Sequence, residues 1–137
     1  TPAMMRRAQM RCGGQLINNQ VEFQPLLDQS KVLATAKELG LAVSAYSPLA
    51  RGKALQPQAI RDIAARLRRP PSEVVLRWII QQGVIAIPMT TKRDNALSNL
   101  NALAFTLSDA DMAAIAALGT RDGRTISPSW MKGRWEE

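Results

Sequence analysis

Two apolar stretches of the sequence end abruptly in hydroxyl-bearing residues. The first, residues 41–47, ends in Ser47, and the second, residues 84–88, is soon followed by Thr90 and Thr91. Both turns precede segments whose apolar residues recur at helical spacing. A hydroxyl-rich turn between the carboxyl end of a buried strand and the N-terminus of a helix is suited to binding phosphate. The spacing therefore predicts two phosphate-binding strand ends that fit one ligand.

The composition is that of one globular domain. Hydrophobic residues make up 46% of the 137 residues and charged residues 21%, which excludes the disordered and membrane-spanning classes. No signal peptide is evident in residues 1–7. Cys12 is the single cysteine, so an internal disulfide and a cysteine zinc cluster are excluded. A reducing compartment fits best, and we expect a cytoplasmic protein with no membrane partner.

The net charge of +7 raises the question of nucleic-acid binding. The basic residues are scattered along the chain, and the aromatic residues, 4% of the total, do not interleave with them. No base-stacking platform is readable, so solvated surfaces explain the charge better than a nucleic-acid partner does. The chain has no histidine and its acidic residues are not clustered, so we predict no metal site.

Short strands alternate with amphipathic helices along the chain. The predicted strands are residues 16–23, 41–47 and 84–88, and the predicted helices are residues 1–11, 30–39, 57–67, 70–82, 91–100 and 108–118. This alternation predicts parallel strands joined by right-handed crossovers. Three units are too few to close a (β/α)8 barrel of about 250 residues, and they would leave unpaired sheet edges and an uncovered apolar face. We therefore predict an α/β fold that forms half of such a TIM barrel.

Local signals place several helix ends. Ser30 is a candidate N-cap, and Gly40 suits the left-handed position after the same helix. Residues 91–94 and 108–111 each have the spacing of a capping box, with aspartate in place of the usual glutamate. Residues 120–137 are polar, and we expect them to form a surface tail.

Five motifs, taken together and in order, resemble those of the aldo-keto reductases. They are Asn-Gln-Val-Glu-Phe-Gln-Pro at 19–25, Ala-Tyr-Ser-Pro-Leu at 45–49, Val-Leu-Arg-Trp at 75–78, Ile-Pro-Met-Thr at 87–90 and Ile-Ser-Pro-Ser-Trp at 126–130. The last is similar to the tails of bacterial members, in which Trp130 would contribute to the substrate pocket. The family consists of nicotinamide-dependent oxidoreductases built on a (β/α)8 barrel. The resemblance implies that residues 1–137 are a single segment, the C-terminal half of that barrel.

The first two motifs imply contacts with the nicotinamide end of the cofactor. Gln20 would hydrogen-bond the carboxamide, and Tyr46 would stack on the nicotinamide face, although a tyrosine at a strand end can also be a core residue. Ser47 and Leu49 would contact the pyrophosphate through a hydroxyl and a backbone N–H. Arg51 would add charge there, or would simply be a solvated loop residue.

The motif at 87–90 implies contacts with the adenosine end. Thr90 and Thr91 would face the phosphates, and Asn99 would reach the adenine. Met89 stands where the family usually has lysine, and Asn95 where it usually has arginine. Those two cations hold the 2′-phosphate that distinguishes NADP from NAD, so either cofactor remains possible for this chain. The neighbouring Lys92 or Arg93 could substitute from the first helical turn.

The resemblance implies no catalytic residue in this segment. Family members use a tyrosine acid, a lysine, an aspartate and a histidine, all in the first half of the barrel. This chain has no histidine, and its single tyrosine, Tyr46, matches the stacking position. We expect the segment alone to be inactive, with the N-terminal half of the barrel as its partner. The complete chain would reduce small carbonyl substrates, either aldehydes or ketones, and keto sugars are one plausible class.

A non-catalytic role is the alternative. Some barrel relatives bind nicotinamide cofactor and act mainly through a protein partner. A half-barrel of this kind would work through association, with another protein or with a second copy of itself. The half-barrel length also fits a fragment of a longer chain.

Overall fold

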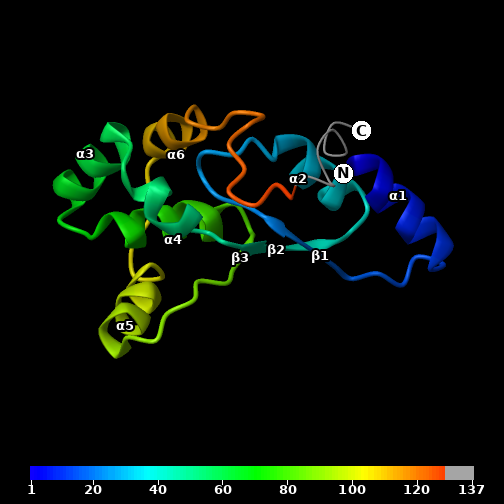
Figure 1. Cartoon of the computed structure of the whole chain (residues 1–137), viewed down its shortest axis with the longest axis horizontal. Coiled ribbons are helices and arrows are strands. Elements are labelled where there is room, and N and C mark those ends of the chain that lie inside the picture. The colour runs from blue at the N-terminus through cyan, green and yellow to red at the C-terminus, as the bar shows by residue number, and fades with distance from the viewer. Residues whose placement is uncertain (129–137) are drawn as a thin grey trace.

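The computed structural model describes residues 1–128, and its three strands form one parallel sheet in the order β1-β2-β3 (Figure 1). The strands are β1 (Asn18–Glu22), β2 (Ala42–Tyr46) and β3 (Ile85–Ala86). The helices are α1 (Pro2–Arg11), α2 (Ser30–Glu38), the 3₁₀ segment η1 (Ala50–Leu55), α3 (Gln58–Leu67), α4 (Pro71–Gln81), α5 (Arg93–Asn101) and α6 (Asp109–Ala116). The alternation of strands with helices and the parallel pairing were both predicted, and both are confirmed.

The two faces of the sheet have different surroundings. Val43 and Ala45 point to the helical side and are buried in the main core, where Phe23 stacks on Trp78 with ring centroids 5.6 Å apart. The opposite face carries Ser44 in register with Ile85, and the Ile85 side chain is 55% exposed. Figure 1 shows that α2 and α4 lie on one side of the sheet. Within residues 1–128, no further strand pairs with the outer edge of β1 or β3.

The third strand is shorter than predicted. The expected strand over residues 84–88 reduces to two residues, although the Ile87 N–H still donates to the Ala45 carbonyl at 3.0 Å. Pro88 has no N–H to continue the ladder. Because only β2 pairs with β3 in the described part of the chain, nothing on the other side extends the strand.

Two of the predicted helix caps are confirmed and two are wrong. Gly40 has φ +66°, and Ser108 and Asp111 form a complete capping box. Ser30 is instead the first residue of α2, and its N–H donates to the Asp28 carboxylate at 2.9 Å. The box expected at residues 91–94 is absent because α5 begins at Arg93, so the hydroxyl and the carboxylate are out of register for capping.

Helix α5 is attached to the core by a buried carboxylate rather than by a buried apolar face. No residue of α5 is buried, and Glu73 of α4 accepts hydrogen bonds from Ser98 Oγ at 2.8 Å and Asn101 Nδ2 at 3.3 Å. Arg69 pairs with the same carboxylate at 3.4 Å. Glu73 itself is almost completely buried. One side chain therefore fixes the helix that follows β3.

Replacement of Glu73 by alanine should loosen α5 selectively. We expect Glu73→Ala to lower the free energy of unfolding by about 2 kcal/mol, because Ser98, Asn101 and Arg69 lose the acceptor that they share. Amide hydrogen exchange should accelerate in α5 before it does in α3. Glu73→Gln keeps the side-chain volume and one acceptor oxygen, so it is the matched control and should cost less. Equal α5 exchange in the wild type and in Glu73→Ala would show that Glu73 does not hold the helix.

The expected tail begins with a segment that lies against the end of β1. Thr120 pairs with Leu27 as an isolated parallel bridge, and the Thr125 N–H donates to the Glu22 carboxylate at 2.7 Å. Ser129 and Trp130 lie outside the described residues, so the role expected of Trp130 has no structural counterpart here.

Candidate functional site

The carboxyl ends of the three strands meet at one edge of the sheet, because all three strands are parallel. Glu22 ends β1 and is the register partner of Tyr46, which ends β2. Ser47 follows directly, and Thr90 comes four residues after the end of β3. The residues predicted to bind phosphate therefore share the edge at which parallel α/β sheets bind ligands.

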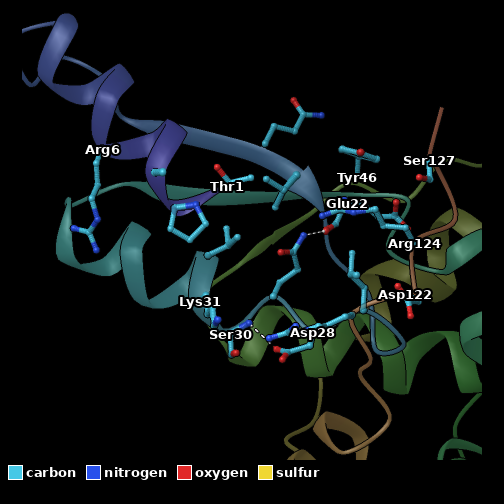
Figure 2. Close-up of a pocket in the computed structure, with 18 residues that line it drawn as sticks. Thr1, Arg6, Glu22, Asp28, Ser30, Lys31, Tyr46, Asp122, Arg124 and Ser127 are labelled. Atoms are coloured by element: carbon cyan, nitrogen blue, oxygen red, sulfur yellow. Dashed lines mark hydrogen bonds between the residues drawn. The ribbon is translucent and has the colours of Figure 1, made fainter. Parts of the chain in front are cut away.

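A cavity of about 950 Å³ lies beside Tyr46 on the β1 side of this edge (Figure 2). It is lined by Gln20 and Glu22 of β1, by residues of α1 and α2, and by Arg124 and Ser127, which follow α6 in the chain. Gln20 is exposed and Tyr46 is half-buried. The structure thus brings together the two residues to which the resemblance assigns the nicotinamide.

The loop after β2 has an unusual backbone. Ser47, Ala50 and Arg51 have φ values of 49°, 48° and 54°, in the left-handed region that non-glycine residues seldom adopt. Such backbone strain is concentrated at ligand-binding and catalytic positions. Leu49 is half-buried and Arg51 is exposed. The strain favours a ligand-binding role for this loop, and the sequence analysis did not predict left-handed backbone at these non-glycine positions.

The residues after β3 form the second part of the edge. Thr90 Oγ1 accepts the Lys92 N–H at 3.1 Å, and Lys92 precedes α5 without a side-chain hydrogen bond to cap the helix. Thr91 is exposed. Asn95 and Asn99 are four residues apart on α5 and therefore lie on one face of the helix. The Met89 side chain, between strand and helix, is 93% exposed.

The predicted contacts do not all gather in one cavity. Gln20 and Tyr46 line the 950 Å³ cavity, whereas the other six predicted residues are not among those that line it. These six residues lie along the ends of β2 and β3 and on α5, and they are Ser47, Leu49, Arg51, Thr90, Thr91 and Asn99. A ligand that touches both groups would have to extend along the sheet edge.

Sequence reasoning missed Glu22, Arg124 and Ser127, which line the same cavity as Tyr46. Glu22 belongs to the motif at 19–25, but no role was assigned to it. Its contacts to Thr125 and Ile126 join residues more than 100 positions apart, and no local pattern encodes such a pairing. An acidic residue at the end of a predicted strand was the one available signal, because a carboxylate that becomes buried there needs hydrogen-bond donors.

The environment of Tyr46 changes the acidity of its phenol. Burial raises the pKa of Tyr46 above its ordinary value of about 10, and the negative charge of Glu22 raises this pKa further. The positive charge of Arg124 acts in the opposite direction. The phenol therefore stays protonated throughout the physiological range.

Titration of the single tyrosine should report this environment directly. We expect the Tyr46 absorbance change near 295 nm to have its midpoint above pH 10 in the wild type. Glu22→Gln removes a negative charge that disfavours the phenolate, so the midpoint should fall. Glu38→Gln removes an exposed carboxylate on α2 that pairs with Arg6, and it should leave the midpoint unchanged. An unchanged midpoint in Glu22→Gln would contradict the assigned cause.

Other site classes find no support in the described residues. Within residues 1–128, no three histidine, cysteine, aspartate or glutamate side chains lie close enough to hold a metal ion. No helix in the same range is long and apolar enough to cross a bilayer.

Parallel strands that alternate with helices are consistent with part of a (β/α)8 barrel. Residues 3–120 match the model of the aldo/keto reductase family. The chain belongs to the aldo/keto reductase family, as the resemblance of its motifs implies.

Individual relatives agree in sequence and in structure. The chain is 39% identical to methylglyoxal reductase DkgB of Escherichia coli O157:H7 over 137 residues, which cover 99% of this chain and 51% of the relative. It superposes on Gox0644 in its apo form with a TM-score of 0.85 and 29% identity, over 90% of this chain and 45% of the other. A variant of Gox0644 in complex with NADPH gives a TM-score of 0.82 and 30% identity, over 86% and 44% of the two chains. The chain thus spans about half the length of the relatives it matches.

Proposed function

We propose that this chain is the nicotinamide-cofactor-binding part of an oxidoreductase that reduces aldehydes or ketones by hydride transfer. The observation that carries the proposal is the meeting of Gln20 and Tyr46 in one cavity at the carboxyl edge of the sheet. Membership of the family and similarity to a protein that has been solved with NADPH support the same proposal.

We assign each proposed contact to a group that follows a strand end or belongs to β1, β2 or α5. Gln20 would hold the carboxamide of the cofactor through its amide, and the half-buried Tyr46 ring would cover one face of the nicotinamide. Ser47, Leu49 and Arg51 would bind the pyrophosphate in the strained loop after β2. The hydroxyls of Thr90 and Thr91, beside the N-terminus of α5, would bind the remaining phosphate, and Asn99 would contact the adenine.

The bound cofactor would supply the hydride. This chain would hold the cofactor in position and would not donate the proton. Tyr46 remains protonated, but it is assigned to the nicotinamide face, and the chain contains no histidine. The acid that protonates the carbonyl oxygen would therefore come from the N-terminal half of the barrel. The uncovered sheet face fits that partner, because exposed apolar side chains such as Ile85 and Ile87 lie on it.

We infer an aldehyde or ketone of small size as the substrate of the complete barrel. The relative from Escherichia coli is named a methylglyoxal reductase, and a relative from Bacillus subtilis is named a glyoxal reductase. Both names describe small molecules with adjacent carbonyl groups. A cytoplasmic location for the protein stays an expectation from its single cysteine.

The test joins this chain to the first half of the Escherichia coli methylglyoxal reductase. NADPH binding is followed by quenching of tryptophan fluorescence, and turnover is followed by the absorbance at 340 nm with methylglyoxal as substrate. We expect the chain alone to bind the cofactor without turnover and the fusion to turn over. Tyr46→Ala in the fusion should weaken binding, whereas Met10→Ala on the exposed part of α1 should not.

Other outcomes separate the two proposed roles. A folded fusion that binds NADPH without turnover would favour the alternative, a non-catalytic half-barrel that acts through protein association. A fusion with cooperative unfolding that binds neither NADPH nor NADH would refute the cofactor site itself.

A further inference from the structure

A carboxylate at the end of β1 is completely buried. Glu22 has 0% exposure, and its oxygens accept the Thr125 N–H at 2.7 Å, the Thr125 hydroxyl at 2.6 Å and the Ile126 N–H at 3.2 Å. Gln24 Nε2 also donates to it at 3.4 Å. A buried carboxylate is costly unless several donors satisfy it, and three of these four donors belong to Thr125 and Ile126.

Glu22 is one of several residues in the range 22–28 that form hydrogen bonds with residues 120–126. The Thr120 N–H donates to the Leu26 carbonyl and the Asp28 N–H donates to the Thr120 carbonyl, both at 3.0 Å. Gln24 Nε2 donates to the Gly123 carbonyl at 2.8 Å. The C-terminal segment, defined here as residues 120–127, is therefore attached at Thr120, at Gly123 and, close to its end, at Thr125 and Ile126.

The C-terminal segment forms part of the cavity beside Tyr46. Arg124 and Ser127 line this cavity together with Gln20 and Tyr46. Figure 2 shows Glu22, Tyr46, Arg124 and Ser127 gathered at the same side of the cavity. Because Glu22 is the register partner of Tyr46, the carboxylate that holds the segment belongs to the same strand pair as the proposed nicotinamide contacts.

We propose that Glu22 is a positioning residue: its buried carboxylate clamps the C-terminal segment across the end of β1 and so holds Arg124 and Ser127 as one wall of the cavity that Gln20 and Tyr46 line. Glu22 acts through the segment and needs no contact with a ligand. Its importance for cofactor affinity rests on the proposed function, whereas its hold on the segment does not.

The rate of tryptic cleavage after Arg121 and Arg124 reports how firmly Glu22 holds the C-terminal segment, and it can be measured on the unmodified chain. Glu22→Gln replaces one acceptor oxygen by an N–H donor, which cannot accept the donors that face it. We expect cleavage at these two sites to accelerate by about tenfold, as the loss of one charge-assisted hydrogen bond predicts. Cleavage after Arg61 and Arg66 in α3 should keep its wild-type rate.

Two further variants keep the test decisive if Glu22→Gln folds poorly. Thr125→Ala removes the hydroxyl donor and should accelerate the same cleavages to a smaller extent, whereas Thr125→Ser keeps the donor and should restore the wild-type rate. Glu38→Gln is the matched control, since its carboxylate is exposed and pairs with Arg6 on α1. Unchanged cleavage in Glu22→Gln and Thr125→Ala, or equal acceleration in α3, would overturn the clamp.

NADPH titration of the same variants tests what the clamp serves. We expect Glu22→Gln to weaken NADPH binding by about fivefold or more, with Thr125→Ser close to the wild type. Faster tryptic cleavage after Arg121 and Arg124 with an unchanged NADPH affinity would overturn the positioning role. If the wild-type chain and its fusion bind no nicotinamide cofactor, the proposed function fails, and the cleavage rates and the Tyr46 titration still decide whether Glu22 holds this wall of the cavity.

Discussion

Gly123→Ala should detach the C-terminal segment from β1 and cost about 3 kcal/mol or more of stability. A Cβ atom on Gly123 would lie 1.7 Å from the Leu26 carbonyl oxygen and 2.4 Å from the carbonyl carbon. Neither atom can move away like a flexible side chain, because both belong to the backbone that bonds to Thr120. The substitution is unfavourable because the backbones approach closely and not because Gly123 needs a left-handed conformation, since the φ of Gly123 is not positive.

Urea unfolding and trypsin cleavage after Arg124 measure this effect together. Gly119→Ala is the matched control in the same region, because a Cβ there would meet backbone atoms of Asp28 and Ala116 only at 3.2–3.3 Å. We expect that variant to cost much less. If Gly123→Ala unfolds and is cleaved like Gly119→Ala, the packing of the C-terminal segment on residues 26–27 is wrong.

The fold could be predicted because its information is local. Apolar runs with branched residues predict the parallel strands, and the helical repeat predicts α3 and α4 close to their observed bounds. The capping box at Ser108 depends on residues three apart, and it is confirmed. Ser30 and Thr91 fail as caps for a related reason: a hydroxyl is useful only at one register, and the packing of the chain decides where each helix begins.

In the candidate site, too, only the features that depend on local sequence could be predicted. The hydroxyls that follow β2 and β3 are read from the sequence, because a residue that follows a parallel strand must lie at its carboxyl edge. The cavity wall formed by Arg124 and Ser127 could not be predicted from the sequence. It depends on the hydrogen bond between Glu22 and Thr125, which are 103 residues apart, and neither residue is unusual in its local setting. The strained turn at Ser47 and Arg51 was also hidden, because a left-handed non-glycine residue leaves no compositional trace.

Met89→Lys and Asn95→Arg should together shift the chain towards NADP. Both positions are exposed, with Met89 at 93%, so neither substitution disturbs packing. A cation at these positions would meet the 2′-phosphate if the proposed adenosine end lies between β3 and α5. Charge-assisted bonds contribute about 1.5–3 kcal/mol, and exposure reduces this, so we expect each substitution to raise the NADPH-to-NADH affinity ratio by about tenfold.

The ratio of the two dissociation constants is the measurement, because it cancels general effects on folding. Met10→Lys is the matched control: Met10 is also strongly exposed, at 76%, and the variant adds the same charge on α1, which lies at the opposite end of the molecule from α5 (Figure 1). A general electrostatic attraction would raise the NADPH affinity alike in Met10→Lys and Met89→Lys, and higher salt would weaken both. A selective rise in Met89→Lys requires a phosphate close to residue 89. An unchanged ratio would place the adenosine end elsewhere and leave only the cavity beside Tyr46 as the cofactor site.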